Sequence, residues 1–169
     1  MTAPDVARLG AASGPRAASV RRLFARYGLE VVHLAPGAAL PGSYWGEAEA
    51  GLLGNRLYVR DDTPLHSLLH EGCHYVCMDD ARRAALDTDA GGEFIEECGV
   101  CYLGVLLAPE IDGYAAAGML ADMDAWGYTF RLGSARAWFE QDAADARDWL
   151  ESAGLVDAAG RIRYEVRHR

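Results

Sequence analysis

The segment His70-Glu71-Gly72-Cys73-His74 contains the residue types and the spacing of a metal-dependent hydrolase. Two histidines four residues apart lie on the same face of a helix, so His70 and His74 can bind one zinc ion together. Glu71 lies about 100° farther round that helix, where it can accept a proton from a water molecule without binding the metal. The pattern predicts His70 and His74 as zinc ligands and Glu71 as the general base. The alternative is a pair of solvent-facing histidines with an unrelated glutamate between them.

A catalytic zinc usually has three protein ligands, and the next predicted helix offers three glutamates for the third position. Glu93 belongs to the first turn, which frays and would hold a ligand poorly. Glu96 and Glu97 each share a helix face with apolar residues. The face of Glu97 is wider and includes small residues, which let two helices approach closely, so we expect Glu97 rather than Glu96 to bind zinc. Acidic residues at a helix start also have a simpler role, because they interact favourably with the helix dipole.

The four cysteines, Cys73, Cys77, Cys98 and Cys101, form two closely spaced pairs. Such pairs could supply a structural zinc site, but pairs of that kind usually sit in turns, whereas both pairs here fall inside predicted helices. Cysteine is a common small core residue, and we expect these four to be reduced core thiols. A redox-sensitive thiol beside the metal ligands is the remaining alternative.

Further polar side chains could assist the site, although core or surface positions are more typical of each. His66 shares a helix face with His70 and could add a ligand at the rim. Tyr128 and Arg131 could polarise a carbonyl group or bind a substrate carboxylate. An aspartate could accept a hydrogen bond from a ligating imidazole, and the candidates are Asp89, Asp122 and Asp124.

The elements that must position these residues are predicted to form an α+β fold, with a small, mostly antiparallel sheet packed on helices and the His70/His74 helix at its centre. Thr63 is the predicted N-cap of that helix. Residues 1–12 are expected to form a flexible arm of a single domain that spans residues 1–169. Expected strands cover residues 29–34, 47–53 and 57–60, and expected helices cover residues 15–27, 64–78, 93–108, 114–126 and 134–152.

A hairpin, a His-Glu-x-x-His helix and a following acid-bearing helix that ends at Leu106-Leu107-Ala108-Pro109 resemble the zincin metallopeptidases. The resemblance is to the gluzincin branch and to small bacterial ImmA/IrrE-type regulatory peptidases, and it covers about residues 44–109. It implies a zinc cofactor, ligation by His70 and His74, Glu71 as the base, and a peptide or protein substrate aligned along the strand at residues 47–53. Gly72 departs from the pattern, because glycine weakens a helix by about 1 kcal/mol relative to alanine.

The formal net charge of −9 disfavours a nucleic-acid partner, which needs a basic face. No segment is apolar enough for a membrane span or a signal-peptide core, so the expected location is the cytoplasm. The leading prediction is a zinc-dependent peptidase. A regulatory or non-catalytic zinc-binding interaction module with the same ligands is one rival, and a structural zinc domain built on the cysteines is another. The sequence leaves the oligomeric state open.

Overall fold

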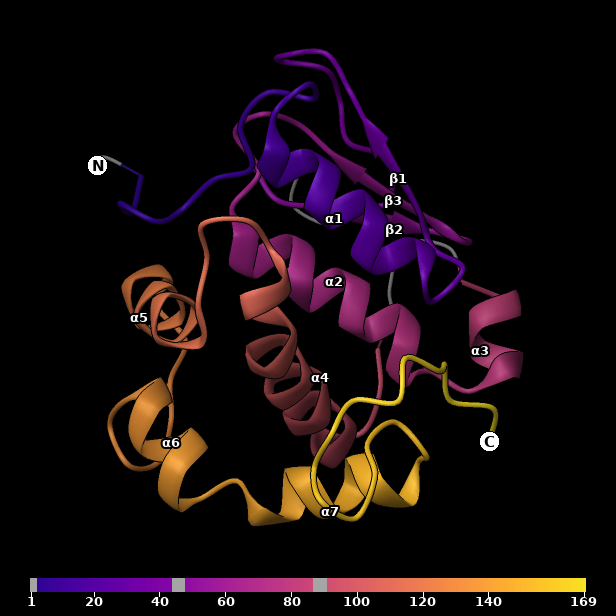
Figure 1. Ribbon diagram of the computed structural model, residues 1–169, viewed down its shortest axis with the longest axis vertical. Coiled ribbons are helices and arrows are strands. Elements are labelled where there is room, and N and C mark those ends of the chain that lie inside the picture. Colours follow the sequence, from indigo (N-terminus) through magenta and orange to yellow (C-terminus); the bar gives the residue numbers. More distant parts are fainter. Residues whose placement is uncertain (1–2, 44–47, 87–90) are drawn as a thin grey trace.

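Helix α2 (Leu65–Cys77), which contains the His-Glu-x-x-His segment, runs through the middle of the structure (Figure 1). The computed structural model describes residues 3–43, 48–86 and 91–169. Every residue of α2 except His70 and Glu71 is buried, so the helix has packed neighbours around most of its circumference. The helix begins directly after Pro64 and ends at Met78, and both of these flanking residues have extended backbones. A helix so enclosed holds the two side chains that it leaves accessible in a fixed direction.

The fold is α+β, as the sequence predicts. The sheet lies on one side of α2 and the helices α4 to α7 lie on the other (Figure 1). No helix in the described part of the chain has the length and apolar character that crossing a bilayer requires. The other elements, in chain order, are α1 (Pro15–Ala25), β1 (Glu30–His33), β2 (Gly51–Leu53), β3 (Arg56–Val59), α3 (Asp80–Ala84), α4 (Phe94–Leu107), the 3-10 turn η1 (Ala108–Glu110), α5 (Ala116–Trp126), α6 (Ala135–Gln141) and α7 (Ala144–Ser152).

The sheet is mixed rather than mostly antiparallel. Its strand order is β1-β3-β2, with β2 and β3 forming the predicted hairpin and β1 pairing parallel to β3. A parallel pair needs a connection of about a dozen residues or more, and the chain between β1 and β2 is long enough to provide it. The strand that was expected to align a substrate, residues 47–53, corresponds in part to the edge strand β2. Residues 44–47 lie outside the described residues. The loop around Gly42 packs against the β2 backbone at Leu52, so this strand is in contact with the chain's own loop.

Residues 6–10, expected to belong to a flexible arm, form a packed segment. Val6 and Leu9 are buried. The Leu9 amide donates a hydrogen bond to the Thr63 carbonyl, and the Leu65 amide donates one to the Ala7 carbonyl. The segment from residue 6 to residue 10 therefore packs against the start of α2. These contacts stabilise the position of the helix that carries the two histidines.

Two further local predictions differ from the structure. Thr63 does not cap α2, because its buried hydroxyl accepts a hydrogen bond from the Arg60 amide in the preceding turn. The expected long helix from Ser134 is divided into α6 and α7 at Asp142 and Ala143, although Ser134 does cap its start by accepting from the Ala137 amide.

Gly72 has a packing role that sequence propensity does not indicate. A Cβ atom at this position would overlap the ring of Phe24, which is fully buried in α1 and cannot move aside. Gly72→Ala should therefore lower the free energy of unfolding by up to about 2 kcal/mol, since overpacking costs about 1–3 kcal/mol and the gain in helix propensity is about 1 kcal/mol.

Chemical denaturation measures this change, with Gly118→Ala in α5 as the matched control. A Cβ at Gly118 would approach only the half-buried Tyr114, at 3.2 Å, so this variant should be neutral or slightly stabilised. Stabilisation of both variants to the same extent would show that α1 does not pack against α2 in this way.

Candidate metal centre

The candidate metal centre lies where α4 packs along α2. His70 and His74 project from α2 on one face, and Glu97 comes from the first turn of α4. Among the described residues, these three form the one group of histidine, cysteine and acidic side chains arranged to hold a metal ion. The close packing of the two helices thus brings one acidic side chain to the histidine pair.

The donor atoms of this group are spaced as zinc ligands are spaced. The Nε2 atoms of His70 and His74 lie 3.1 Å apart, and they lie 2.9 Å and 3.2 Å from the two carboxylate oxygens of Glu97. Two atoms that each lie 2.0–2.1 Å from a tetrahedral zinc are separated by roughly 3.3 Å. Two imidazoles and one carboxylate are also a known catalytic zinc ligand set. The donor set and its spacing both fit zinc.

The group is buried on the side of the imidazoles and open on the side of the carboxylate. The side chains of His70 and His74 are 16% and 8% exposed, whereas that of Glu97 is 43% exposed. The Nδ1 atom of His74 is buried without a hydrogen-bond partner in the described parts of the chain, so Nε2 is the nitrogen through which His74 interacts. A metal held here could be reached from the solvent beside Glu97.

The Glu97 carboxylate and the His70 imidazole each stabilise the charged form of the other. Burial raises the pKa of the Glu97 carboxyl, but hydrogen bonds from His70 and His74 outweigh burial and hold that pKa well below its usual range. Burial also lowers the pKa of His70, yet interactions with Tyr128, Cys101 and Glu97 leave it well above the ordinary value. A negative carboxylate between two imidazoles attracts protons as well as metal cations, so protons compete with a metal for this position.

Glu96 has a different environment from Glu97, although the two are adjacent on α4. Its carboxylate is buried and forms ion pairs with Arg82 at 2.7 Å and Arg167 at 3.3 Å. Glu93, the third glutamate considered, is the exposed N-cap residue of α4. Of the three glutamates, the structure therefore brings Glu97 to the histidine pair.

The two glutamates should separate metal binding from stability. Glu97→Gln should lower zinc affinity at least about tenfold, because it removes the negative ligand. Glu96→Gln should leave zinc affinity nearly unchanged and lower the free energy of unfolding by about 1–3 kcal/mol, because a buried carboxylate that binds two arginines is lost. Competition titration with a zinc-binding dye and chemical denaturation measure the two effects. Loss of zinc in only the Glu96 variant would contradict this assignment.

Glu71 is half-buried and lies beside the histidine pair on α2. It has no hydrogen-bond or ion-pair partner in the parts of the chain that the structure describes. Its negative charge contributes, after burial, to a Tyr128 pKa that is raised to about 12. Glu71 is therefore near Tyr128 and free to interact with a molecule that enters the site.

Sequence reasoning did not detect how closely His66 and Tyr128 pack beside the site. His66 is buried rather than at the rim, with its ring 4.9 Å from that of Trp126 and 5.7 Å from that of Tyr128. Burial, together with the charge of His70, lowers the pKa of His66 to about 4, so His66 is neutral at neutral pH. The Tyr128 ring also lies 6.1 Å from that of His70. The helical spacing of His66 and His70 indicated that His66 lies on the same helix face as His70. No local pattern indicated that Tyr128 packs against these two histidines.

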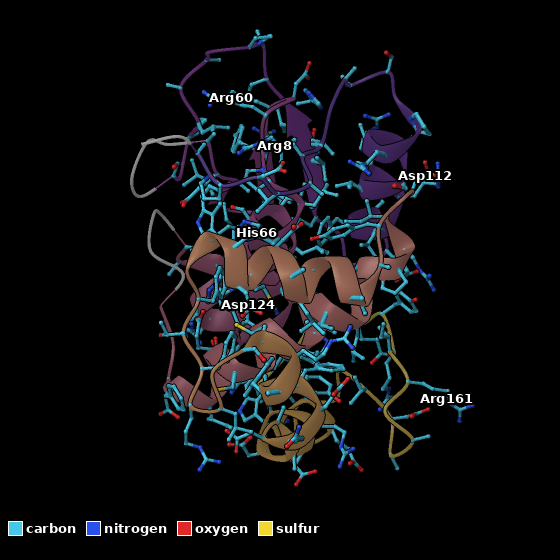
Figure 2. All side chains as sticks on the ribbon, turned by 90° about the vertical axis from the view of Figure 1, so that its left-hand side faces the viewer. Arg8, Arg60, His66, Asp112, Asp124 and Arg161 are labelled. Atoms are coloured by element: carbon cyan, nitrogen blue, oxygen red, sulfur yellow. The ribbon has the colours of Figure 1, made fainter. Side chains whose placement is uncertain are left out.

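The aspartates considered as hydrogen-bond acceptors for the ligands bind other groups. Asp122 accepts from the Ala7 amide and from the Tyr114 hydroxyl, and Asp124 accepts from the Ala135 amide at the start of α6. Figure 2 shows Asp124 on the side of α5 that faces α6, while His66 lies on the other side of that helix. Asp89 lies outside the described residues, and Arg131 forms an ion pair with Asp142 in the wall of the pocket that Glu97 also lines.

The cysteines are free thiols, and no group of them is arranged to hold a metal among the residues described. Cys73 and Cys77 are fully buried in the core. Cys101 lies beside the site, with its Sγ atom 4.0 Å from His70 Nδ1, and it occupies the place where a ligating histidine usually has a carboxylate, carbonyl or water. Cys101 thus corresponds to the alternative of a thiol that contacts a metal ligand.

A pocket of about 540 Å³ adjoins the group on the side of Glu97. Glu97, Cys101 and Tyr128 form the wall that the pocket shares with the site. Comparison of the chain with models of protein families, with curated proteins and with solved structures finds no match. The resemblance to zincins therefore remains a prediction from the residues.

Proposed function

We propose that the protein is a zinc-dependent hydrolase that cleaves peptide bonds. One observation carries the proposal: the Nε2 atoms of His70 and His74 and the Glu97 carboxylate converge within 3.2 Å of one another, and the unpaired Glu71 follows directly in the same helix. A purely structural site would need no accessible base beside the metal and would not need an open side.

Each residue has a separate role in the proposed reaction. A zinc ion held by this group would lower the pKa of bound water and polarise the substrate carbonyl. Glu71 accepts the proton of the attacking water and returns it to the departing amine. Tyr128, whose ring lies against His70, can donate a hydrogen bond to the carbonyl oxygen as negative charge develops on it. His70, His74 and Glu97 hold the metal and take no part in the proton transfer.

Hydrolysis of a diverse peptide mixture tests this function. The full chain is incubated with zinc, and new peptide termini are identified by mass spectrometry. Parallel reactions contain a chelator, or use the Glu71→Gln variant. We expect cleavage only with zinc and only in the wild type. Stoichiometric zinc binding without cleavage of any peptide would contradict the peptidase and favour the regulatory zinc-binding module.

A further inference from the structure

Three aromatic side chains line the pocket beside the metal centre in the part away from the metal ligands: Phe94, Phe130 and Trp138. Phe130 stacks on Trp138, with ring centroids 5.1 Å apart and planes inclined by 25°. Phe94, at the start of α4, forms another part of the wall. Flat aromatic surfaces pack well against another ring or a large aliphatic group. The pocket volume of about 540 Å³ is within the range of ligand-binding pockets and exceeds what a single methyl group needs.

Phe94 is the most exposed large apolar side chain in the described part of the chain. It is 82% exposed, whereas the next such residue, Leu132, is 43% exposed and does not line the pocket. A ligand that covers an exposed phenylalanine at the mouth of an apolar pocket is stabilised by burial of that ring. Exposed apolar surface of this kind marks binding sites.

The charges around the pocket indicate which sign of charge a ligand can carry next to its apolar part. Three carboxylates line it, those of Glu97, Asp142 and Asp145. Arg131 also lines it, but this arginine is already paired with Asp142. Glu97 belongs to the metal centre and Asp142 is paired with Arg131, so Asp145 is the lining carboxylate that has no ion-pair partner among the described residues. Its charge repels a negatively charged residue next to the bound apolar side chain and attracts a basic one.

We propose that this pocket binds a large apolar side chain of the substrate, preferably an aromatic one, in a peptide segment whose neighbouring residues are basic. The proposal rests on the proposed peptidase function and adds the class of substrate. Phe94 and the Phe130/Trp138 stack determine the specificity, while the shared wall of Glu97, Cys101 and Tyr128 places the bound side chain next to the reacting bond.

The test uses capped hexapeptides that differ at one central residue, which is Phe, Ala or Glu and is flanked by lysines. Binding to the full chain is measured in chelator, where no hydrolysis interferes, from the amide chemical shifts of Cys98, Thr129 and Phe130. Cleavage is measured separately with zinc. We expect the Phe peptide to bind at least about tenfold more tightly than the Ala peptide, and the Glu peptide to bind most weakly. The same order should hold for the cleavage rates.

Phe94→Ser and Leu132→Ser form a matched pair, because each replaces an exposed apolar side chain but only Phe94 lines the pocket. Phe94→Ser should weaken binding of the Phe peptide severalfold and leave the Ala peptide unchanged, and Leu132→Ser should affect neither. Equal affinity for the Phe and Ala peptides, or equal effects of the two variants, would overturn the inference. Selective binding of the Phe peptide without any cleavage would support the pocket and contradict the peptidase. Cleavage of all the peptides without a preference for Phe would support the peptidase and contradict the pocket.

Discussion

The double variant His70→Ala/His74→Ala should bind no zinc under conditions in which the wild type binds one ion per chain. Each imidazole supplies one of three protein ligands. Because apparent zinc-binding free energies of about 10–16 kcal/mol are shared among three or four ligands, each lost ligand costs roughly a hundredfold to ten-thousandfold in affinity. Glu97 alone then remains, and a single carboxylate binds zinc too weakly to survive dialysis. Elemental analysis after dialysis measures the zinc content.

The matched control for this variant is His168→Ala. His168 is an exposed histidine near the end of the chain that contacts Asp80, away from the candidate metal centre. Its loss should leave the zinc content at one ion per chain. Full zinc occupancy in the double variant would contradict the site and direct attention to the cysteines.

Glu71→Gln should reduce peptide hydrolysis by a factor of about a hundred to ten thousand, the usual contribution of a general base, and leave the zinc content unchanged. Glutamine has nearly the shape of glutamate but cannot accept the proton from water. Glu71 contacts none of the three proposed ligands through a hydrogen bond in the described residues, so its replacement should not disturb them. Initial rates with the best peptide of the mixture, and zinc content by elemental analysis, measure the two properties.

Glu93→Gln makes the same chemical change at the exposed start of α4, where the side chain has no proposed role. It should retain the wild-type rate. If Glu71→Gln kept the full rate, Glu71 would not be the base. If it instead lost its zinc, Glu71 would be a ligand, and the proposed division of roles on α2 would be wrong.

The sequence predicted the helix that carries the candidate ligands because several local signals agree there. The histidine spacing, Pro64 at its start and the apolar residues around it all indicate one buried helix, and α2 has these bounds within one or two residues. The preference for Glu97 came from the width of an apolar face that includes small residues. In the structure the Glu97 carboxylate lies beside the two imidazoles of α2.

What the sequence could not predict depends on contacts between distant segments. Glu96 is held away from the site by Arg82 and Arg167, which are separated from it by 14 and 71 positions. His66 packs against Trp126, the last residue of α5, and against Tyr128, which follows that helix. No local pattern contains such pairings.

The lack of local signals for contacts between distant segments also explains where the predicted fold was wrong. β1 pairs parallel to β3 because a long connection returns the chain to the far side of the hairpin, whereas periodicity indicates a strand but not its neighbour. Val6 and Leu9 were too isolated in the sequence to predict a packed segment, yet the start of α2 buries both.

A crystal structure of the zinc-loaded protein, with anomalous diffraction measured at the zinc absorption edge, tests the central claim most directly. The account predicts one anomalous peak per chain, about 2.0–2.2 Å from Nε2 of His70, Nε2 of His74 and a carboxylate oxygen of Glu97, with Glu71 nearby but not bound. A peak among the cysteines, or the absence of any peak while the two imidazoles stay hydrogen-bonded to Glu97, would contradict it.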